Sequence, residues 1–327
     1  MAAQILDGEA LADKIKAGLA EEVEALKKAG KPPHLVAVQV GDPPASRIYV
    51  NQQKKACESI GLIYDLNQLD ENCSEQDVLD EIKRLNEDDG VTGMILQMPL
   101  GPDMDARKVQ VTIDPDKDVE GMHPANMGRL FYGGGIVQPC TPAGAVELLK
   151  STGVDLAGKE AVVVGHSEIV GKPIAAILLQ SLMESPTVTV CHIATKDLAA
   201  HTKQAEILFV GTGKAQAVWQ RYNRAKKAGE NPPVPDLSPL IKADMIKDGA
   251  IVIDVAINRL PKALDDEGNP VKNEKGKNAM MTVGDVEFEA AKDKCSWITP
   301  VPGGCGPMTV AMLLKNTVEA AKAAAGM

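Results

Sequence analysis

The sequence has no apolar run near the ~20 residues that a helix needs to cross a membrane. Its opening stretch, MAAQILDGEALADKIKAGLAEEV, mixes acids and lysines in an amphipathic helical pattern and lacks the basic start and apolar stretch of a signal peptide. Positive charge is also scarce, because 35 Lys and Arg residues face 45 Asp and Glu residues, a net charge of −10. That balance argues against nucleic acid and an anionic membrane as partners, and we expect a cytoplasmic protein.

Cysteine and histidine patterns typical of metal and nucleophilic sites are missing too. None of the six cysteines stands in a CxxC pair or at another metal-ligand spacing, so we expect reduced thiols and no metal. The five histidines do not pair with a serine or cysteine at the spacing of a hydrolase motif. The negative net charge does not exclude a small anionic ligand, since binding of such a ligand depends on local basic groups.

The sequence does contain a regular alternation of short apolar runs and helical patterns, which predicts an α/β fold with a parallel sheet. In the first half, strands are expected at 34–41, 62–69 and 91–100 and a helix at 46–60, and Ser74 is placed to cap another helix. In the second half, four buried strands are expected in the runs EAVVVG, TVTVC, EILFVG and AIVIDV.

The chain is long enough for two domains, and a boundary is expected near 139–153, where two prolines give way to a helix. We expect the Ala-rich C-terminal helix to return to the first domain and make it discontinuous. The predicted domains are therefore 1–145 plus 300–327, and 146–299.

Two hydrophilic inserts, 214–237 and 261–279, interrupt the second half and are expected as surface excursions. The first carries the basic stretch RYNRAKKAG. Three interpretations stay open for it: a solvated face, an anion-binding patch, or the docking surface of a partner protein.

The stretch AVVVGHSEIVGKP (161–173) combines a strand, a tight turn and a helix start. Gly165 permits the turn, Ser167 can cap the helix or donate to a phosphate, and Gly171 allows helix and strand to approach closely. A purely structural turn is the alternative, because the spacing is not that of the full dinucleotide fingerprint. The next strand ends in CHI (191–193) rather than in an acid or arginine, which leaves the choice between NAD and NADP open at this point.

Three further segments indicate a specific ligand. Tyr49 and Gln53 lie one helical turn apart on one face of a predicted helix, and Gln97 ends a predicted strand. PDKDVEGMHPANMGRL (115–130) packs acids and a glycine into a loop. TPVPGGCGPMT (299–309) holds three prolines and three glycines in eleven residues, which is typical of a rigid loop close to a ligand or another backbone.

These segments resemble the bifunctional methylenetetrahydrofolate dehydrogenase/methenyltetrahydrofolate cyclohydrolase family over nearly the whole chain. The matching motifs are YVxxxxKA, a strand ending in QMPL, PDKDV-GMHPxNxGRL, PCTPxG, VVVGxSxIVGKP and ITPVPGG-GPMTV. The resemblance implies two α/β domains flanking a cleft, the second a Rossmann-like doubly wound sheet that binds NAD(P). It also implies a tetrahydrofolate substrate on the first domain and a homodimer.

Residue by residue, the resemblance implies a catalytic set of Tyr49, Gln53, Gln97 and Glu120. Tyr49 would stack on the aminobenzoate ring, Gln97 would sit beside the one-carbon unit, and Glu120 would hydrogen-bond the pterin. Around them, the implied substrate contacts are Leu96, Met98, Pro302, Gly303, Gly304, Cys305 and Gly306. The implied cofactor contacts are Thr141, Gly165, His166, Ser167, Ile193, Gly213 and Ile257.

Two departures from the family pattern matter for function. Gln53 stands where the family has the lysine that assists the cyclohydrolase step, and an amide cannot supply a titratable amine, so we expect a dehydrogenase with weak or absent hydrolysis. His166 and Ile193 stand where NADP-using members place arginine or serine, which favours NAD. His192 or the basic insert could restore NADP binding.

Three other functions are kept as alternatives. The first is a bifunctional enzyme that also forms 10-formyltetrahydrofolate. The second is a folate-binding regulatory subunit without turnover, against which the intact glycine turn argues. A general hydroxyacid dehydrogenase is the third, and it leaves the folate-type motifs unexplained.

Overall fold

The computed structural model describes residues 2–327 and divides them into two compact units, neither continuous in sequence. One, the six-stranded unit, combines the residues up to Glu9 with Ala145–Gly306. The other, the three-stranded unit, combines Ala10–Gly144 with Pro307–Met327. The expected domain boundaries differ from these at the first nine residues, at Ala145 and at 300–306.

The three-stranded unit is built on a parallel sheet in the order β3-β2-β4. Its strands are β2 (His34–Val40), β3 (Ile63–Leu69) and β4 (Gly93–Leu96), all within the predicted runs. Its core joins β2 and β4 to the apolar face of α3 through Val78, Ile82 and Leu85. The helices that belong wholly or partly to this unit are α1 (Gly8–Lys28), α2 (Pro44–Ser59), α3 (Glu75–Asn86), α4 (Ala106–Gln110), α5 (Pro124–Tyr132), α6 (Cys140–Lys150) and α11 (Cys305–Ala325). Three of them, α1, α6 and α11, begin in one unit and end in the other.

Helix α3 begins where the sequence predicts. The Ser74 side chain accepts a hydrogen bond from the Asp77 backbone N–H at 3.2 Å, and the Asp77 carboxylate accepts one from the Ser74 N–H at 2.8 Å. This capping box satisfies two N–H groups that the helix cannot pair internally. The predicted cap is therefore confirmed.

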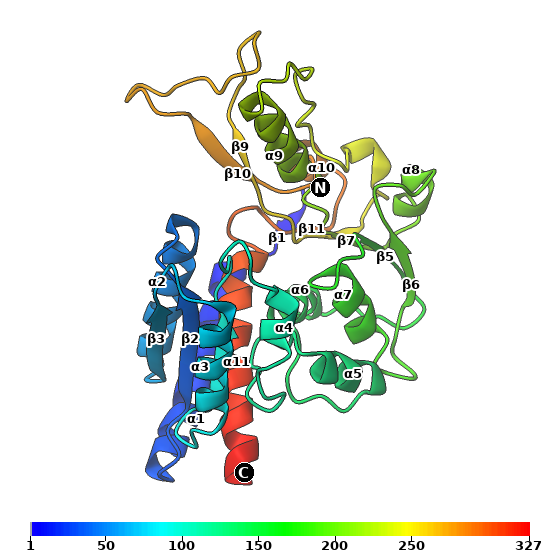
Figure 1. The fold of residues 1–327 in the computed structure, drawn as a ribbon. Helices are drawn as coiled ribbons and strands as arrows, with labels where there is room; N and C mark the ends of the chain where they lie inside the picture. The colour runs from blue at the N-terminus through cyan, green and yellow to red at the C-terminus, as the bar shows by residue number, and fades with distance from the viewer. Residues whose placement is uncertain (1) are drawn as a thin grey trace. The chain divides into compact units, whose positions relative to one another are not determined.

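The C-terminal helix α11, red in Figure 1, is fixed to its unit by polar contacts. The Asn316 side-chain amide donates to the backbone oxygens of Val119 at 2.9 Å and Gln138 at 2.8 Å. Lys322 forms an ion pair with Glu22 of α1 at 2.9 Å. One buried asparagine thus ties together the two loops that precede and follow α5.

The six-stranded sheet is parallel throughout, in the order β1-β11-β8-β7-β5-β6. From β5 the chain moves to β6 on one side and then returns to β7 on the other, so the strand order reverses at β5. The strands are β1 (Gln4–Ile5), β5 (Glu160–Val164), β6 (Thr187–Cys191), β7 (Ile207–Val210), β8 (Ile251–Asp254) and β11 (Trp297–Ile298).

The expectation of four buried strands in this half is wrong for one of them. β5, β7 and β8 are almost fully buried, but β6 lies at the sheet edge and Val190 is 44% exposed. A short β-branched run predicts a strand but does not reveal whether a neighbour covers its second side. The sheet is accompanied by α7 (Gly171–Leu178), α8 (Leu198–Thr202), a 3₁₀ turn (Ala243–Met245) and α10 (Phe288–Ala291).

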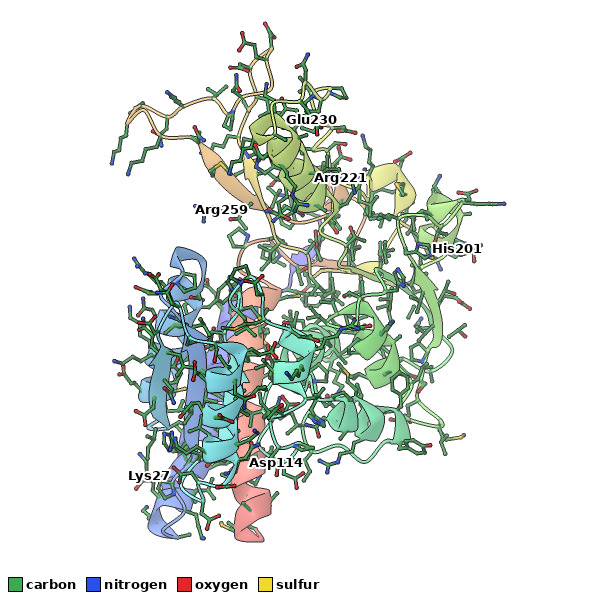
Figure 2. All side chains as sticks on the ribbon, in the orientation of Figure 1. Lys27, Asp114, His201, Arg221, Glu230 and Arg259 are labelled. Carbon is green, nitrogen blue, oxygen red and sulfur yellow. The ribbon has the colours of Figure 1, made fainter. Side chains whose placement is uncertain are left out.

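The first hydrophilic insert is more ordered than a surface excursion. It forms α9 (Lys214–Lys227), whose buried Trp219 and Tyr222 pack on Leu260 of the antiparallel pair β9 (Asn258–Pro261) and β10 (Met280–Val283). Figure 1 shows α9 beside this hairpin, and Figure 2 marks Arg221 and Arg259 on the two elements. The helix was missed because two aromatics spaced three residues apart are a weak apolar stripe in an otherwise polar run.

Within residues 2–327, no helix has the length and apolarity needed to span a membrane.

Candidate active site

A cavity of about 360 Å³ opens within the three-stranded unit. It brings together six of the residues expected at the folate, contributed by α2, the end of β4 and the loop before α5. Its lining consists of Ser46, Tyr49, Gln53, Ile95, Leu96, Gln97, Met98, Glu120, Cys140, Thr309, Val310 and Leu313. A mainly apolar wall with a few convergent polar groups is typical of a small-molecule site.

Gln53 and Gln97 are buried and hydrogen-bonded to each other across this cavity. The Gln97 side-chain N–H donates to Gln53 Oε1 at 2.8 Å, and the Gln97 backbone N–H donates to the oxygen of Val38 at 2.8 Å. The Tyr64 hydroxyl donates to the same Gln53 oxygen at 3.4 Å. Because the Gln53 oxygen accepts both bonds, the group it offers to a ligand is its NH₂, a donor that cannot take up a proton.

Tyr64 is a site residue that the sequence did not predict. It lies on β3, where successive side chains point to opposite faces of the sheet. This alternation could have predicted which face of the sheet Tyr64 occupies. What alternation could not reveal is its partner on α2. Burial raises the pKa of the Tyr64 hydroxyl well above its usual value, so it acts as a neutral donor.

Glu120 supplies the acidic group of the cavity. Burial, reinforced by the charge of neighbouring Asp118, raises its pKa from 4.5 to about 7. Asp118 is fully buried and accepts hydrogen bonds from the backbone N–H of His123 at 2.7 Å and from the Asn126 amide at 3.0 Å. The Asp118 carboxylate thus fixes the loop that carries Glu120. The Glu120 carboxyl group has the raised pKa of about 7 and ionises near neutral pH.

The lining also includes six residues that were not predicted: Ser46, Ile95, Cys140, Thr309, Val310 and Leu313. The last three lie on α11. The predicted return of the C-terminal helix to the first domain could have indicated that this helix contributes to the site. Thr141, expected at the cofactor, belongs to this unit, and its hydroxyl lies 3.0 Å from that of Thr309.

The glycine-rich loop at 302–306 belongs to the six-stranded unit and closely approaches another backbone. The Gly8 N–H donates to the Gly303 oxygen at 2.9 Å, and a Cβ on Gly8 would lie 1.8 Å from the oxygen of Gly304. Gly303 has φ +104°, a conformation that side chains disfavour. Contact of Pro302, Gly303, Gly304, Cys305 and Gly306 with folate remains a prediction.

The expected cofactor residues of the six-stranded unit gather at one edge of its sheet. Gly165 follows β5, Ile193 follows β6, Gly213 follows β7 and Ile257 follows β8. Since the strands are parallel, all four lie at their carboxyl ends, beside the point where the strand order reverses. Dinucleotides bind at this edge in doubly wound sheets.

The turn after β5 is tight and needs glycine at two positions. Gly165 has φ +121°, and a Cβ on Gly171 would lie 1.9 Å from the Gly165 oxygen, so helix and turn touch through both glycines. Ser167 Oγ accepts the Val170 N–H at 3.1 Å and closes the turn. Two large apolar side chains stand exposed at the same edge, Ile193 at 67% and Ile257 at 49%, which is typical of a surface that a ligand covers.

Two histidines meet at this edge. The ring centroids of His166, in the turn after β5, and His192, after β6, are 4.7 Å apart. His192 Nδ1 accepts the Ala194 backbone N–H at 3.2 Å.

A second cavity, of about 320 Å³, lies at the opposite, amino-terminal edge of the sheet around Glu206 and Gly249, and contains none of the expected site residues. In the described part of the chain, His, Cys, Asp and Glu do not cluster as a metal site.

Comparison with known proteins decides the family. Residues 6–120 match the family model for the catalytic domain of tetrahydrofolate dehydrogenase/cyclohydrolase. Residues 139–227 and 237–325 match the model for the NAD(P)-binding domain of the same family. The chain belongs to this family. The resemblance drawn from its motifs is confirmed, as is an α/β fold of two domains, one of which binds NAD(P).

Individual relatives agree along the whole chain. The bifunctional protein FolD of Nautilia profundicola is 45% identical over 318 residues, which cover 97% of each chain. The structure of bifunctional FolD from Campylobacter jejuni has a TM-score of 0.80 and 42% identity, covering 98% of this chain and 99% of that one. The dehydrogenase-cyclohydrolase of Trypanosoma brucei, complexed with NADP cofactor and an inhibitor, has a TM-score of 0.81 and 32% identity over the full length of both chains.

Proposed function

We propose that this family member oxidises 5,10-methylenetetrahydrofolate to 5,10-methenyltetrahydrofolate by hydride transfer to NAD(P). The observation that carries the proposal is the convergence of Tyr49, Gln53, Gln97 and Glu120 on one cavity. A nicotinamide cofactor held at the carboxyl edge of the six-stranded sheet would supply the hydride acceptor.

Each of these residues has a role that its surroundings support. Tyr49 is 48% exposed on the cavity wall, so its ring is available to stack on the aminobenzoate group. Gln97 and Gln53, held by their mutual hydrogen bond, position the one-carbon bridge. Ionised Glu120 accepts N–H donors of the pterin. None of these roles requires Gln53 to accept a proton from the substrate.

Hydrolysis of the methenyl product is proposed to be weak or absent. It requires water activation and proton transfer, and Gln53 offers the cavity an amide NH₂. The neighbouring lysines do not replace it: among the described residues, neither Lys54 nor Lys55 lines the cavity, and both are exposed.

A bifunctional enzyme is the second candidate, and it fits the comparisons at least as well. The relatives at 44–45% identity carry the name bifunctional protein FolD. Glu120 favours it within this chain, because a carboxyl group with a pKa of about 7 in the same cavity can take up and release a proton. Formation of 10-formyltetrahydrofolate would then depend on Glu120 and not on residue 53.

Initial rates with NAD and with NADP test the proposal, provided that reduced cofactor and methenyl product are followed together. We expect both to form in equal amounts, faster with NAD, because neither His166 nor Ile193 offers the fixed charge that a 2′-phosphate prefers. A faster rate with NADP would contradict the cofactor preference. Binding of folate without any reduced cofactor would contradict the oxidation and leave a regulatory folate-binding subunit.

Glu120 predicts a pH dependence of substrate binding. Its pKa of about 7 means that the carboxylate forms as the pH rises through 7, so the KM for methylenetetrahydrofolate is expected to be up to roughly tenfold higher near pH 6 than near pH 8.

Ionisation of Glu120 also makes the free energy of unfolding depend on pH, but a higher pH lowers stability while it improves substrate binding. The folded pKa exceeds the ordinary 4.5, so the folded state binds more protons and its stability falls as the pH rises from about 4.5 through 7. Steady-state kinetics of Glu120→Gln should show a high KM that no longer depends on pH; an unchanged profile would contradict the role.

Two expectations about partners are retained as proposals. In the sheet formed by residues 2–327, the edge strand β6 has one unpaired side and an exposed Val190, which supports a homodimer through this edge. The outer face of α9, with exposed Arg221, Arg224 and Lys227, supports a partner protein at the 214–237 insert. A cytoplasmic location is likewise proposed, supported by six free cysteines.

A further inference from the structure

The end of the second strand of a dinucleotide-binding sheet usually decides which cofactor binds. In such folds an acid there bonds the ribose 2′-hydroxyl of NAD, or a basic residue nearby accommodates the 2′-phosphate of NADP. Here that strand is β6, followed by His192 and Ile193, and the facing turn after β5 contributes His166. The position therefore holds neither a fixed negative nor a fixed positive charge.

The two rings, here called the histidine pair, touch each other with centroids 4.7 Å apart and planes tilted by 36°. His192 is half-buried and its protonation state is constrained: Nδ1 accepts the Ala194 N–H, so the neutral ring carries its proton on Nε2. Adding a second proton would break that bond. His166 is exposed, so water can stabilise its charged form.

The pair can therefore take up one positive charge more readily than two. Two imidazolium rings at this distance repel each other, and the His192 cation also costs the Ala194 bond. The charged side chains on the same two turns are Glu168 and Lys172, 3.7 Å apart, and Lys196 and Asp197, the latter capping α8 through the Ala200 N–H. The formal charges of these four side chains sum to zero, so on these two turns a proton on the pair sets the net charge.

We propose that the histidine pair makes the choice between NAD and NADP depend on pH, with NADP gaining affinity relative to NAD as the pH falls. The proposal rests on the dehydrogenase function proposed above. The neutral pair donates His192 Nε2–H to a ribose hydroxyl, which suits NAD. A proton on His166 adds the positive charge that a 2′-phosphate requires, and the phosphate in turn favours that proton.

Equilibrium binding of each cofactor tests the proposal without reference to turnover. The dissociation constants of NADH and NADPH are measured by the fluorescence of the reduced nicotinamide near pH 6 and near pH 8. We expect the ratio of the NADPH constant to the NADH constant to be up to about tenfold smaller at the lower pH, because the phosphate and the added proton attract each other.

Three variants separate the pair from other causes. His166→Gln removes the proton site, so the ratio should vary only as far as the phosphate's own ionisation dictates. His166→Arg supplies a permanent charge and should give tight NADPH binding at both pH values. His201→Gln is the matched control, an exposed histidine on α8 in the same unit (Figure 2), and should behave like the unaltered protein.

Two results would overturn the proposal: a ratio that does not change with pH, or a His166→Gln variant that keeps the full change. If both cofactors bind and NAD is reduced while the ratio stays constant, only the histidine pair is refuted. If neither cofactor binds at either pH, the proposed dehydrogenase function fails with it.

Discussion

Replacing Gln53 by lysine is expected to raise hydrolysis of methenyltetrahydrofolate by about 10²- to 10⁴-fold, the usual contribution of a positioned acid–base group. The new amine would stand on the cavity wall, where Gln53 now lies between Gln97 and Tyr64. Oxidation should change much less, because it depends on the relative position of substrate and cofactor. The measurement is the loss of the methenyl product with time, alongside the rate of reduced-cofactor formation.

Lys54→Gln is the matched control for this experiment. Lys54 is the next residue of α2, is exposed, and lies 4.0 Å from Glu58. Its loss should leave both activities unchanged. If the unaltered protein already hydrolyses the methenyl product as fast as it forms it, residue 53 does not limit the step. Glu120→Gln would then be expected to abolish hydrolysis, as the bifunctional alternative requires.

Introducing a methyl group at Gly171 is expected to weaken cofactor binding by about 10- to 100-fold, equivalent to roughly 1–3 kcal/mol of overpacking. The Cβ of Gly171→Ala would lie 1.9 Å from the Gly165 oxygen and 3.0 Å from the His166 nitrogen. These neighbours are backbone atoms, which cannot rotate aside, so α7 or the turn after β5 must move. Titration of the protein with NADH measures the effect.

Folate binding should survive the Gly171 substitution if the cavity around Gln53 is the folate site, because every residue lining that cavity belongs to the three-stranded unit. Gly18→Ala is the control: this helical glycine has open space around its Cβ position, and alanine there should stabilise α1 by up to ~1 kcal/mol. Unchanged NADH affinity in Gly171→Ala would show that the turn after β5 does not hold the cofactor. Equal loss of folate binding would indicate general unfolding.

The features that could be predicted from sequence are those that depend on neighbouring residues. The strands β2, β5 and β7 follow from apolar runs, and the start of α3 follows from Ser74 and Asp77, three residues apart. The glycine turn was predictable for the same reason, since a steric requirement for glycine acts at the position itself.

Long-range partners could not be predicted. Nothing in the spacing of Tyr64 and Gln53 indicates that strand and helix would bring the hydroxyl to the amide, or that Ala194 would fix the proton of His192. The packing of α9 on β9 depends on Leu260, about forty residues after Trp219. Such contacts depend on the whole fold, and periodicity within a short window carries no information about them.

The pairing of β1 also has a consequence for biosynthesis. Gln4 and Ile5 pair with Trp297 and Ile298 and with no other strand of the sheet described for residues 2–327. During translation, therefore, the first strand leaves the ribosome long before its only hydrogen-bonding partner exists. The nascent chain must keep this segment unpaired until Trp297 and Ile298 have emerged, so the six-stranded sheet can be completed only after they have been synthesised. A deletion that removes Gln4 and Ile5 should accordingly act on cofactor binding before it acts on the cavity of the three-stranded unit.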